Sequence, residues 1–354
     1  MSSRSLQSLS LAGVLLAVTG CANFTYYAQS VGGQLDVVAN RQPISRLLRE
    51  PTTPPVLKAQ LTDVLAIRQF AAQVLHLPDN ASYRGYTDLQ RQYVVWNVVA
   101  TPAFAMTPQQ WCFPVVGCVN YRGYFRQRRA EVFAATLRQR GDDVAVIGVP
   151  AYSTLGWFAD PVLNTTITWP RARLASLIFH ELTHQVLYIK DDTAFNESFA
   201  ATVEEEGVRR WLEQRQDAAA LASYREDRRR RERFIQLVMA TRAELVQHYA
   251  TDMNAAERRT AKARAFAELR AKYQRLKTEW GGYAGYDRWF AQDLNNAHLA
   301  ALNTYQVYVP AFRALLAQQQ GDLPAFYAAA RALGNLPTAQ RQVRLRELAV
   351  GNTQ

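Results

Sequence analysis

The sequence predicts an α+β fold that is mainly helical, with a small sheet ahead of one buried helix and an antiparallel helix after it. Long segments whose apolar residues recur near a 3.6-residue period make up most of the chain. β-Branched and aromatic runs are few, and they precede residue 170. The buried helix contains His180-Glu181-Leu182-Thr183-His184 within an apolar run.

Length and composition predict a packed core. The chain has 354 residues, 49% of them apolar, so residues 22–354 can form one domain, with two intimate lobes (about 22–190 and 191–354) as the alternative. The formal net charge of +11 favours anionic surfaces such as lipid head groups, or acidic substrates. We expect no nucleic-acid partner, because the N-terminus predicts export.

Residues 1–21 predict a secretion signal. Residues 9–18 form an apolar stretch that is too short to span a bilayer. It ends in Val18-Thr19-Gly20-Cys21, which resembles a bacterial lipobox and implies a mature chain lipidated at Cys21. Because Ala22 follows instead of Asp, the resemblance favours the periplasmic face of the outer membrane. The alternative is an ordinary signal with an incidental cysteine.

The first part of the mature chain predicts two helices separated by prolines. Residues 26–35 are the first helix, and Pro51, Pro54 and Pro55 prevent its continuation. Residues 56–75 have the helical period. A β-branched and aromatic run over 93–104 then predicts a strand.

A pair of cysteines follows this strand. Cys112 and Cys118 flank a segment with Pro and Gly, which lets the chain turn back. In an oxidising compartment such a pair predicts a small disulfide loop; two buried thiols are the alternative.

The segment before the buried helix predicts one helix and two strands. Residues 126–140 form an Arg-rich amphipathic helix that ends at Gly141. Residues 144–149 and 164–168 are short strands. An edge strand at this place would suit a peptide backbone that adds to the sheet.

The buried helix carries residues suited to a zinc hydrolase. His180 and His184 lie one turn apart on one face, about 6 Å along the axis. Glu181 is rotated by about 100° from His180, so it flanks the ion without being forced to bind it. Two imidazoles that hold Zn²⁺, with a carboxylate beside them that takes a proton from water, form such a site.

Glu197 is the candidate for the third ligand. A short polar break at 190–193 separates the two helical segments, so the second helix is expected to run back along the first. Glu197 lies near its start and therefore comes close to His184. Asp192 or Thr193 is placed to cap this helix.

These two segments resemble the gluzincin metallopeptidases, the thermolysin-like class. The match consists of the His-Glu-x-x-His motif and Asn196-Glu197-Ser198-Phe199-Ala200. The resemblance implies a zincin-like core, His180, His184 and Glu197 as zinc ligands, and Glu181 as general base. The chain departs from thermolysin in its shorter connection and in Ala201, where thermolysin has an Asp, so the partner of a zinc histidine stays unassigned.

Over nearly its whole length the chain is more similar to a bacterial family of predicted aminopeptidases. The similarity includes residues 152–161, the His-Glu-Leu-x-His helix and the run from Phe195 into Glu204-Glu205-Glu206-Gly207. This implies a peptide substrate with a free N-terminal amine.

Several further residues are candidates for substrate binding or catalysis. Tyr152 and Trp157 belong to an aromatic loop that lines the cleft or, equally, packs in the core. Glu204 lies two turns after Glu197 on the same face, where it would hold a substrate amine or a zinc histidine; a solvated acidic face is the alternative. Tyr305 is the first candidate for stabilising the oxyanion, with His298, Tyr286 and Tyr283 as alternatives. His298 is also a candidate for contacting substrate.

The remaining segments predict helices. Residues 194–250, 255–278 and 322–348 are helical, the last with a break at 334–337. The Arg-rich run at 225–233 contains acidic residues, so it predicts a solvated helix face; contact with lipid head groups is the alternative.

Together these features predict a lipid-anchored zinc peptidase of the bacterial cell envelope. The alternative is a non-catalytic envelope scaffold or assembly lipoprotein with a structural or relic zinc site. An intact Glu181 argues against that alternative, because a structural site needs no base.

Overall fold

The computed structural model describes residues 26–113, 117–302 and 307–350. The predicted export signal, Cys21 and Tyr305 lie outside the described residues. The protein is mainly helical, 61% helix with small sheets, which agrees with the predicted α+β class. Within the described part, no helix has both the length and the apolar character that crossing a bilayer requires.

A helix over residues 26–39 opens the described chain. The later helices are α2 (Ile44–Arg49), α3 (Pro55–Gln73), α4 (Gln127–Gln139), α5 (Asn164–Ile167), α6 (Arg171–Thr183), α7 (Thr193–Gln214), α8 (Ala218–Ala250), α9 (Ala255–Glu279), α10 (Asp287–Phe290), α11 (Asn296–Ala301), α12 (Val309–Gln318), α13 (Leu323–Gly334) and α14 (Thr338–Val350). The strands are β1 (Gln42–Pro43), β2 (Gly85–Thr87), β3 (Val95–Pro102), β4 (Trp111–Phe113), β5 (Gly117–Val119), β6 (Arg122–Tyr124), β7 (Asp142–Val149) and β8 (Val162–Leu163).

The strands form two small sheets and a hairpin. The sheet orders are β1-β2-β8 and β6-β3-β7, and β3 pairs with β7 in antiparallel register along its whole length. The predicted strands at 93–104 and 144–149 are therefore confirmed as β3 and β7. The hairpin β4-β5 places Cys112 opposite Cys118, and a disulfide joins them.

The strand predicted at 164–168 is wrong, because these residues form α5 and the strand β8 ends just before them. Local polar side chains explain the difference. Asn164 accepts a hydrogen bond from the Leu89 amide and donates one to the Arg91 carbonyl. The Thr166 hydroxyl donates to the Leu163 carbonyl. Such side-chain bonds to the backbone compete with a strand ladder, and β-branched composition alone does not reveal them.

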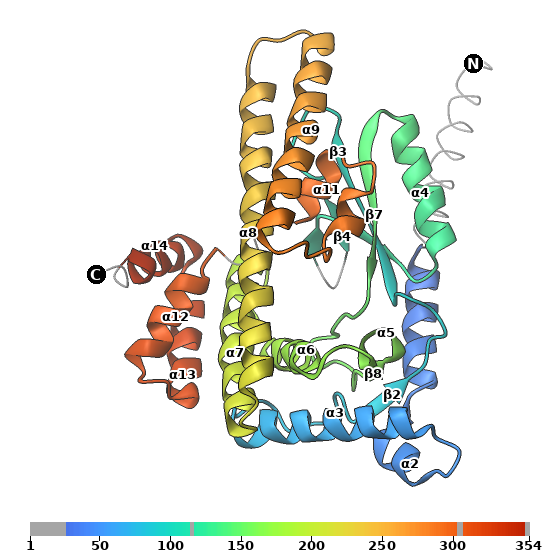
Figure 1. Ribbon diagram of the computed structural model, residues 1–354, viewed down its shortest axis with the longest axis vertical. Coiled ribbons are helices and arrows are strands. Elements are labelled where there is room, and N and C mark those ends of the chain that lie inside the picture. The colour runs from blue at the N-terminus through green and yellow to red at the C-terminus, as the bar shows by residue number, and fades with distance from the viewer. Residues whose placement is uncertain (1–25, 114–116, 303–306, 351–354) are drawn as a thin grey trace, which may run out of the picture.

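Three large apolar cores and two smaller clusters hold these elements together. The largest joins α3, α6 and α7 to the C-terminal helices, and its fully buried aromatic residues include Phe179, Phe199 and Phe326. A second core lies between α8 and α9, and a third covers one face of the β3 sheet with α4. In Figure 1, α8 runs beside α7 at one end and beside α9 at the other. It therefore links the first two cores.

Helices α6 and α7 form the contact that positions the candidate site. The contacts pair residues of the two helices in reverse order. His184 and His180, at the end of α6, contact Glu197 near the start of α7, whereas Ser176, earlier in α6, contacts Glu204 later in α7. This confirms the predicted antiparallel course. Asp192 caps α7, as predicted, by accepting a hydrogen bond from the Phe195 amide at 3.1 Å.

Asn196 fixes the connection between the two helices. It is fully buried, its amide donates to the Ile189 carbonyl at 2.7 Å, and its side-chain oxygen accepts from the Ile189 amide at 2.7 Å. The turn after α6 is thus tied to the first turn of α7. This explains why an Asn precedes the glutamate ligand candidate.

Replacing Asn196 should therefore destabilise the fold. In Asn196→Ala, two backbone groups of Ile189 lose their partner, so the free energy of unfolding should fall by about 1–3 kcal/mol. Urea unfolding measures this change. The control is Asn335→Ala at an exposed helix end, where we expect a change within about 0.5 kcal/mol. Equal losses in the two variants would contradict the role of Asn196.

Candidate metal centre

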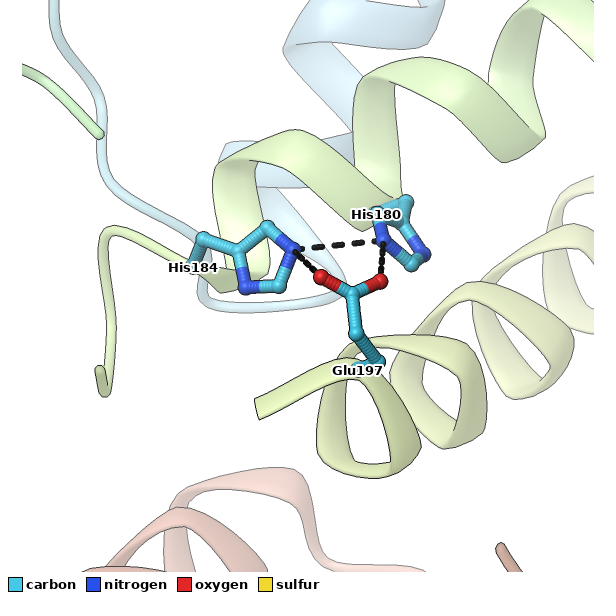
Figure 2. Close-up of side chains that lie close together, drawn as sticks. All are labelled: His180, His184 and Glu197. Carbon is cyan, nitrogen blue, oxygen red and sulfur yellow. Dashed lines mark hydrogen bonds and ion pairs between the residues drawn. The ribbon is translucent and has the colours of Figure 1, made fainter. Parts of the chain in front are cut away.

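Three side chains converge where α6 and α7 meet (Figure 2). His180 Nε2 lies 3.2 Å from Glu197 Oε2 and 3.2 Å from His184 Nε2. His184 Nε2 lies 3.6 Å from Glu197 Oε1. All these candidate ligand atoms lie within 4.8 Å of one another. The predicted trio is therefore brought together around one small space.

The spacing and chemistry of these atoms fit a divalent metal ion. Ligand atoms that bind tetrahedral Zn²⁺ at about 2.0–2.1 Å lie about 3.3 Å apart, close to the separations found here. Two imidazole nitrogens with one carboxylate oxygen also leave the fourth position open, as in catalytic zinc sites. The residues present therefore fit a metal ion.

The two histidines reach this space from the end of α6. The helix ends at Thr183, and His184 is its C-cap residue. Its backbone stays helical (φ −60°, ψ −22°), so the spacing of four residues still places both imidazoles on one face. The motif spacing in the sequence is therefore sufficient to predict this half of the site.

Glu204 orients one of these imidazoles. Its Oε2 lies 2.9 Å from His180 Nδ1, and the Ser176 hydroxyl donates to its Oε1. These contacts assign the Nδ1 proton of neutral His180 to the bond with Glu204, which leaves Nε2 free to bind a metal. Of the two roles predicted for Glu204, the geometry favours holding a zinc histidine over binding a substrate amine. His184 Nδ1, by contrast, is buried without a hydrogen-bond partner among the described residues.

We expect Glu204→Gln to weaken metal binding without abolishing it. The amide keeps the shape of the side chain but loses the negative charge that raises the basicity of His180. Changes in such outer partners typically lower metal affinity about 10- to 100-fold. Competition with a zinc chelator measures the dissociation constant. Glu206→Gln on the same helix is the matched control, because Glu206 pairs with Arg209 and Arg210 instead. Equal affinities for both variants would contradict the assignment.

The electrostatics of the site favour a cation. Burial, together with the charges of Glu197, Asp160 and Glu204, raises the pKa of Glu181 to about 7, against the opposing effect of His180. Burial disfavours a charged His180, yet its bonds to Glu197 and Glu204 outweigh burial and raise its pKa well above the ordinary value. Without a cation, a proton on His180 therefore offsets the charge of the surrounding carboxylates.

A cavity of about 620 Å³ opens beside the three side chains. Glu181 lines it together with His180 and Glu197, and its walls come from α6, α7, α8 and the chain on either side of residues 303–306. No described lining residue belongs to a strand. The described part of the wall therefore offers no edge strand to which a substrate could add, and α8 lines the cavity together with α6. The described lining residues are Trp169, Arg173, Ser176, Leu177, His180, Glu181, Glu197, Glu204, Arg228, Arg231, Glu232, Ile235, Ala301, Leu302 and Val307.

Three predicted substrate-binding residues are not among those that line the cavity. The Tyr152 hydroxyl donates to Gln34, and its ring packs against Phe125. Trp157 is 78% exposed. His298 is buried and accepts a hydrogen bond from the Asn295 amide in the cap of α11. These residues are chemically suitable, but their positions depend on tertiary contacts that a local pattern does not contain.

Tyr305 lies outside the described residues and stays a prediction. Leu302 and Val307, on either side of its segment, both line the cavity.

Sequence reasoning missed Ser176 and the wall formed by α8. Ser176 lies one helical turn before His180, and this spacing places the two side chains on the same face of the helix. The Arg-rich run was predicted to be a solvated face with internal ion pairs. Arg229 fits that prediction because it pairs with Glu226 at 2.6 Å. Arg228 and Arg231, however, face the cavity.

Fold and site together define a mainly helical protein with a two-histidine, one-carboxylate group that suits a divalent metal ion. The chain belongs to the family described as "Putative aminopeptidase", whose model matches residues 25–345 and so includes the whole site. No curated protein and no solved structure shows a significant match to the chain.

Proposed function

We propose that this protein is a zinc-dependent peptidase of the gluzincin class with a zincin-like core, and that it acts as an aminopeptidase. One observation carries the proposal: His180, His184 and Glu197 converge beside a cavity that Glu181 also lines. The family description supports peptides as the substrate.

The residues of the site have separate roles in the proposed reaction. His180, His184 and Glu197 would hold Zn²⁺, which would supply a Lewis acid able to polarise a carbonyl and to increase the acidity of water. Glu181 accepts a proton from water and later donates it to the leaving amine. Burial and the neighbouring carboxylates raise the pKa of Glu181, which opposes the effect of a bound cation and keeps this carboxylate basic enough to accept a proton. Glu204 keeps His180 in the orientation that binding requires. Tyr305 is our candidate for stabilising the oxyanion.

The activity should rise with pH on the acid side. Glu181 must be ionised to accept a proton, and its pKa is about 7 without a metal. A cation nearby favours the charged carboxylate, so the loaded enzyme should have an acid limb with its midpoint below about 7. A profile of kcat/KM against pH measures this midpoint. Activity that falls as pH rises from about 5 to 7 would be incompatible with this base.

We also propose that the protein is anchored in the bacterial cell envelope through lipid on Cys21, with residues 22–354 as one domain. The lipobox-like sequence and the cysteine pair joined by a disulfide support this location.

The decisive test combines metal content with hydrolysis. The purified protein should contain about one zinc per chain. It should cleave aminoacyl fluorogenic substrates, lose this activity with a chelator and regain it with Zn²⁺. Bound zinc with no hydrolysis of any free or amine-blocked peptide would favour the envelope scaffold instead.

A further inference from the structure

Two arginines line the cavity without an ion-pair partner among the described residues. Arg173 lies on α6, and Arg231 lies on α8 across from it. Arg173 stacks on the Trp169 ring, with its guanidinium carbon 3.8 Å from the ring centroid. Both arginines are exposed residues, and partial desolvation together with the nearby charge of Arg231 lowers the pKa of Arg173. Two cations that face the same space attract an anion.

The other charged side chains of the cavity are already engaged. Glu197 and Glu204 contact the histidines. Glu232 lies 3.4 Å from Arg228, which also pairs with Glu205. Apart from the proposed base Glu181, the described wall has no unpaired carboxylate to hold a substrate ammonium group. The free charge that it offers to a substrate is positive.

The distance between the two arginines and the candidate metal site can be expressed in residues of an extended peptide. Arg173 precedes His180 by seven residues on α6, which is two helical turns, or about 10 Å along the axis. An extended peptide spans about 3.3 Å per residue, so this distance corresponds to about three residues. On α8, Arg228, Arg231, Glu232 and Ile235 have the spacing of one helix face, which places Arg231 on the wall toward α6.

We propose that Arg173 and Arg231 bind the C-terminal carboxylate of a short peptide whose cleaved bond lies about three residues upstream, at the metal site. The inference rests on the proposed function. Guanidinium groups suit this role because they bind carboxylates through paired, charge-assisted hydrogen bonds. Stacking on Trp169 restricts the plane of one of them. The carboxylate of an acidic substrate side chain, at the same distance from the cleaved bond, could bind the two arginines in the same way. The experiment below distinguishes the two carboxylates.

The test compares oligoalanine peptides of increasing length as free acids, as C-terminal amides and as N-acetylated acids. Mass spectrometry of the products identifies the cleaved bond. Where the carboxylate lies about three residues beyond that bond, amidation should lower kcat/KM about 10- to 100-fold, mainly through KM. In Arg173→Ala and Arg231→Ala the ratio of kcat/KM for the acid to kcat/KM for the amide should approach one. Arg231→Lys should restore part of the preference for the acid. Arg229→Ala is the matched control, because Arg229 also lies on α8 but is not among the residues that line this cavity, and it pairs with Glu226. For this variant the ratio of kcat/KM for acid and amide should stay at the wild-type value.

Calorimetry with the Glu181→Gln variant separates this proposal from the proposed function, because peptide binding does not require turnover. Tighter binding of the acid than of the amide supports the carboxylate site even if no peptide is cleaved. Equal binding of acid and amide, or a preference that survives both alanine variants, overturns it. A further peptide carries a C-terminal amide and a Glu about three residues beyond the cleaved bond. If it binds as tightly as the free acid, the C-terminal assignment is overturned and an acidic side chain is identified as the bound group.

Discussion

Glu181→Gln should keep the metal and lose nearly all turnover. Glutamine has the same shape, but it cannot accept a proton, and positioned general bases contribute about 10²- to 10⁴-fold to rates. The metal should stay because the ligand atoms come from His180, His184 and Glu197. We therefore expect kcat to fall about 10³-fold or more with unchanged zinc content. Steady-state kinetics and metal analysis of the same preparation measure both quantities.

A second carboxylate of the same cavity provides the control. Glu232 also lines the cavity but contacts Arg228 and not a histidine. Glu232→Gln should change kcat only a few-fold, so a large loss would be specific to Glu181. Wild-type turnover by Glu181→Gln, or equal losses in both variants, would refute the assignment of the base.

Glu197→Ala should abolish stabilisation by zinc. A ligand present at 100 times its dissociation constant stabilises the fold that binds it by about 2.7 kcal/mol, so Zn²⁺ should raise the Tm of the wild-type protein. Without Glu197 only two imidazoles remain, and the shift should vanish at the same concentration. Thermal unfolding with and without Zn²⁺ measures the difference.

Glu206→Ala is the control for this experiment. It removes a carboxylate from the same helix that pairs with Arg209 and Arg210. Its Tm without metal should fall, but the shift caused by Zn²⁺ should persist. A full zinc-induced shift in Glu197→Ala would mean that the ion binds elsewhere.

The sequence predicted the parts of the site that depend on local spacing. His180 and His184 are four residues apart, and they stay on one face at the end of α6 because the backbone of the cap residue, His184, remains helical. The short connection brought Glu197 to them by reversing the chain. Helices α3, α4, α9, α13 and α14 were also predicted close to their observed bounds, since each has a long periodic pattern or an end marked by Pro or Gly.

What the sequence did not predict depends on contacts between distant segments. Arg173 and Arg231 come from different helices, and no period relates them. The Arg-rich run revealed its charge but not which of its faces meets α6. The chemistry of His298 and Tyr152 suits substrate binding, but tertiary packing directs both side chains to other neighbours.

Because α8 lines the cavity but supplies no candidate ligand atom, part of the proposed substrate contact is encoded outside the helices that would hold the ion. The candidate ligands come from α6, its C-cap residue and α7, whereas in the proposed carboxylate site α6 would contribute Arg173 and α8 would contribute Arg231. Under this proposal, substitutions on α8 would change which peptides bind without changing the residues proposed for hydrolysis. Related proteins could then differ in substrate preference and share one reaction.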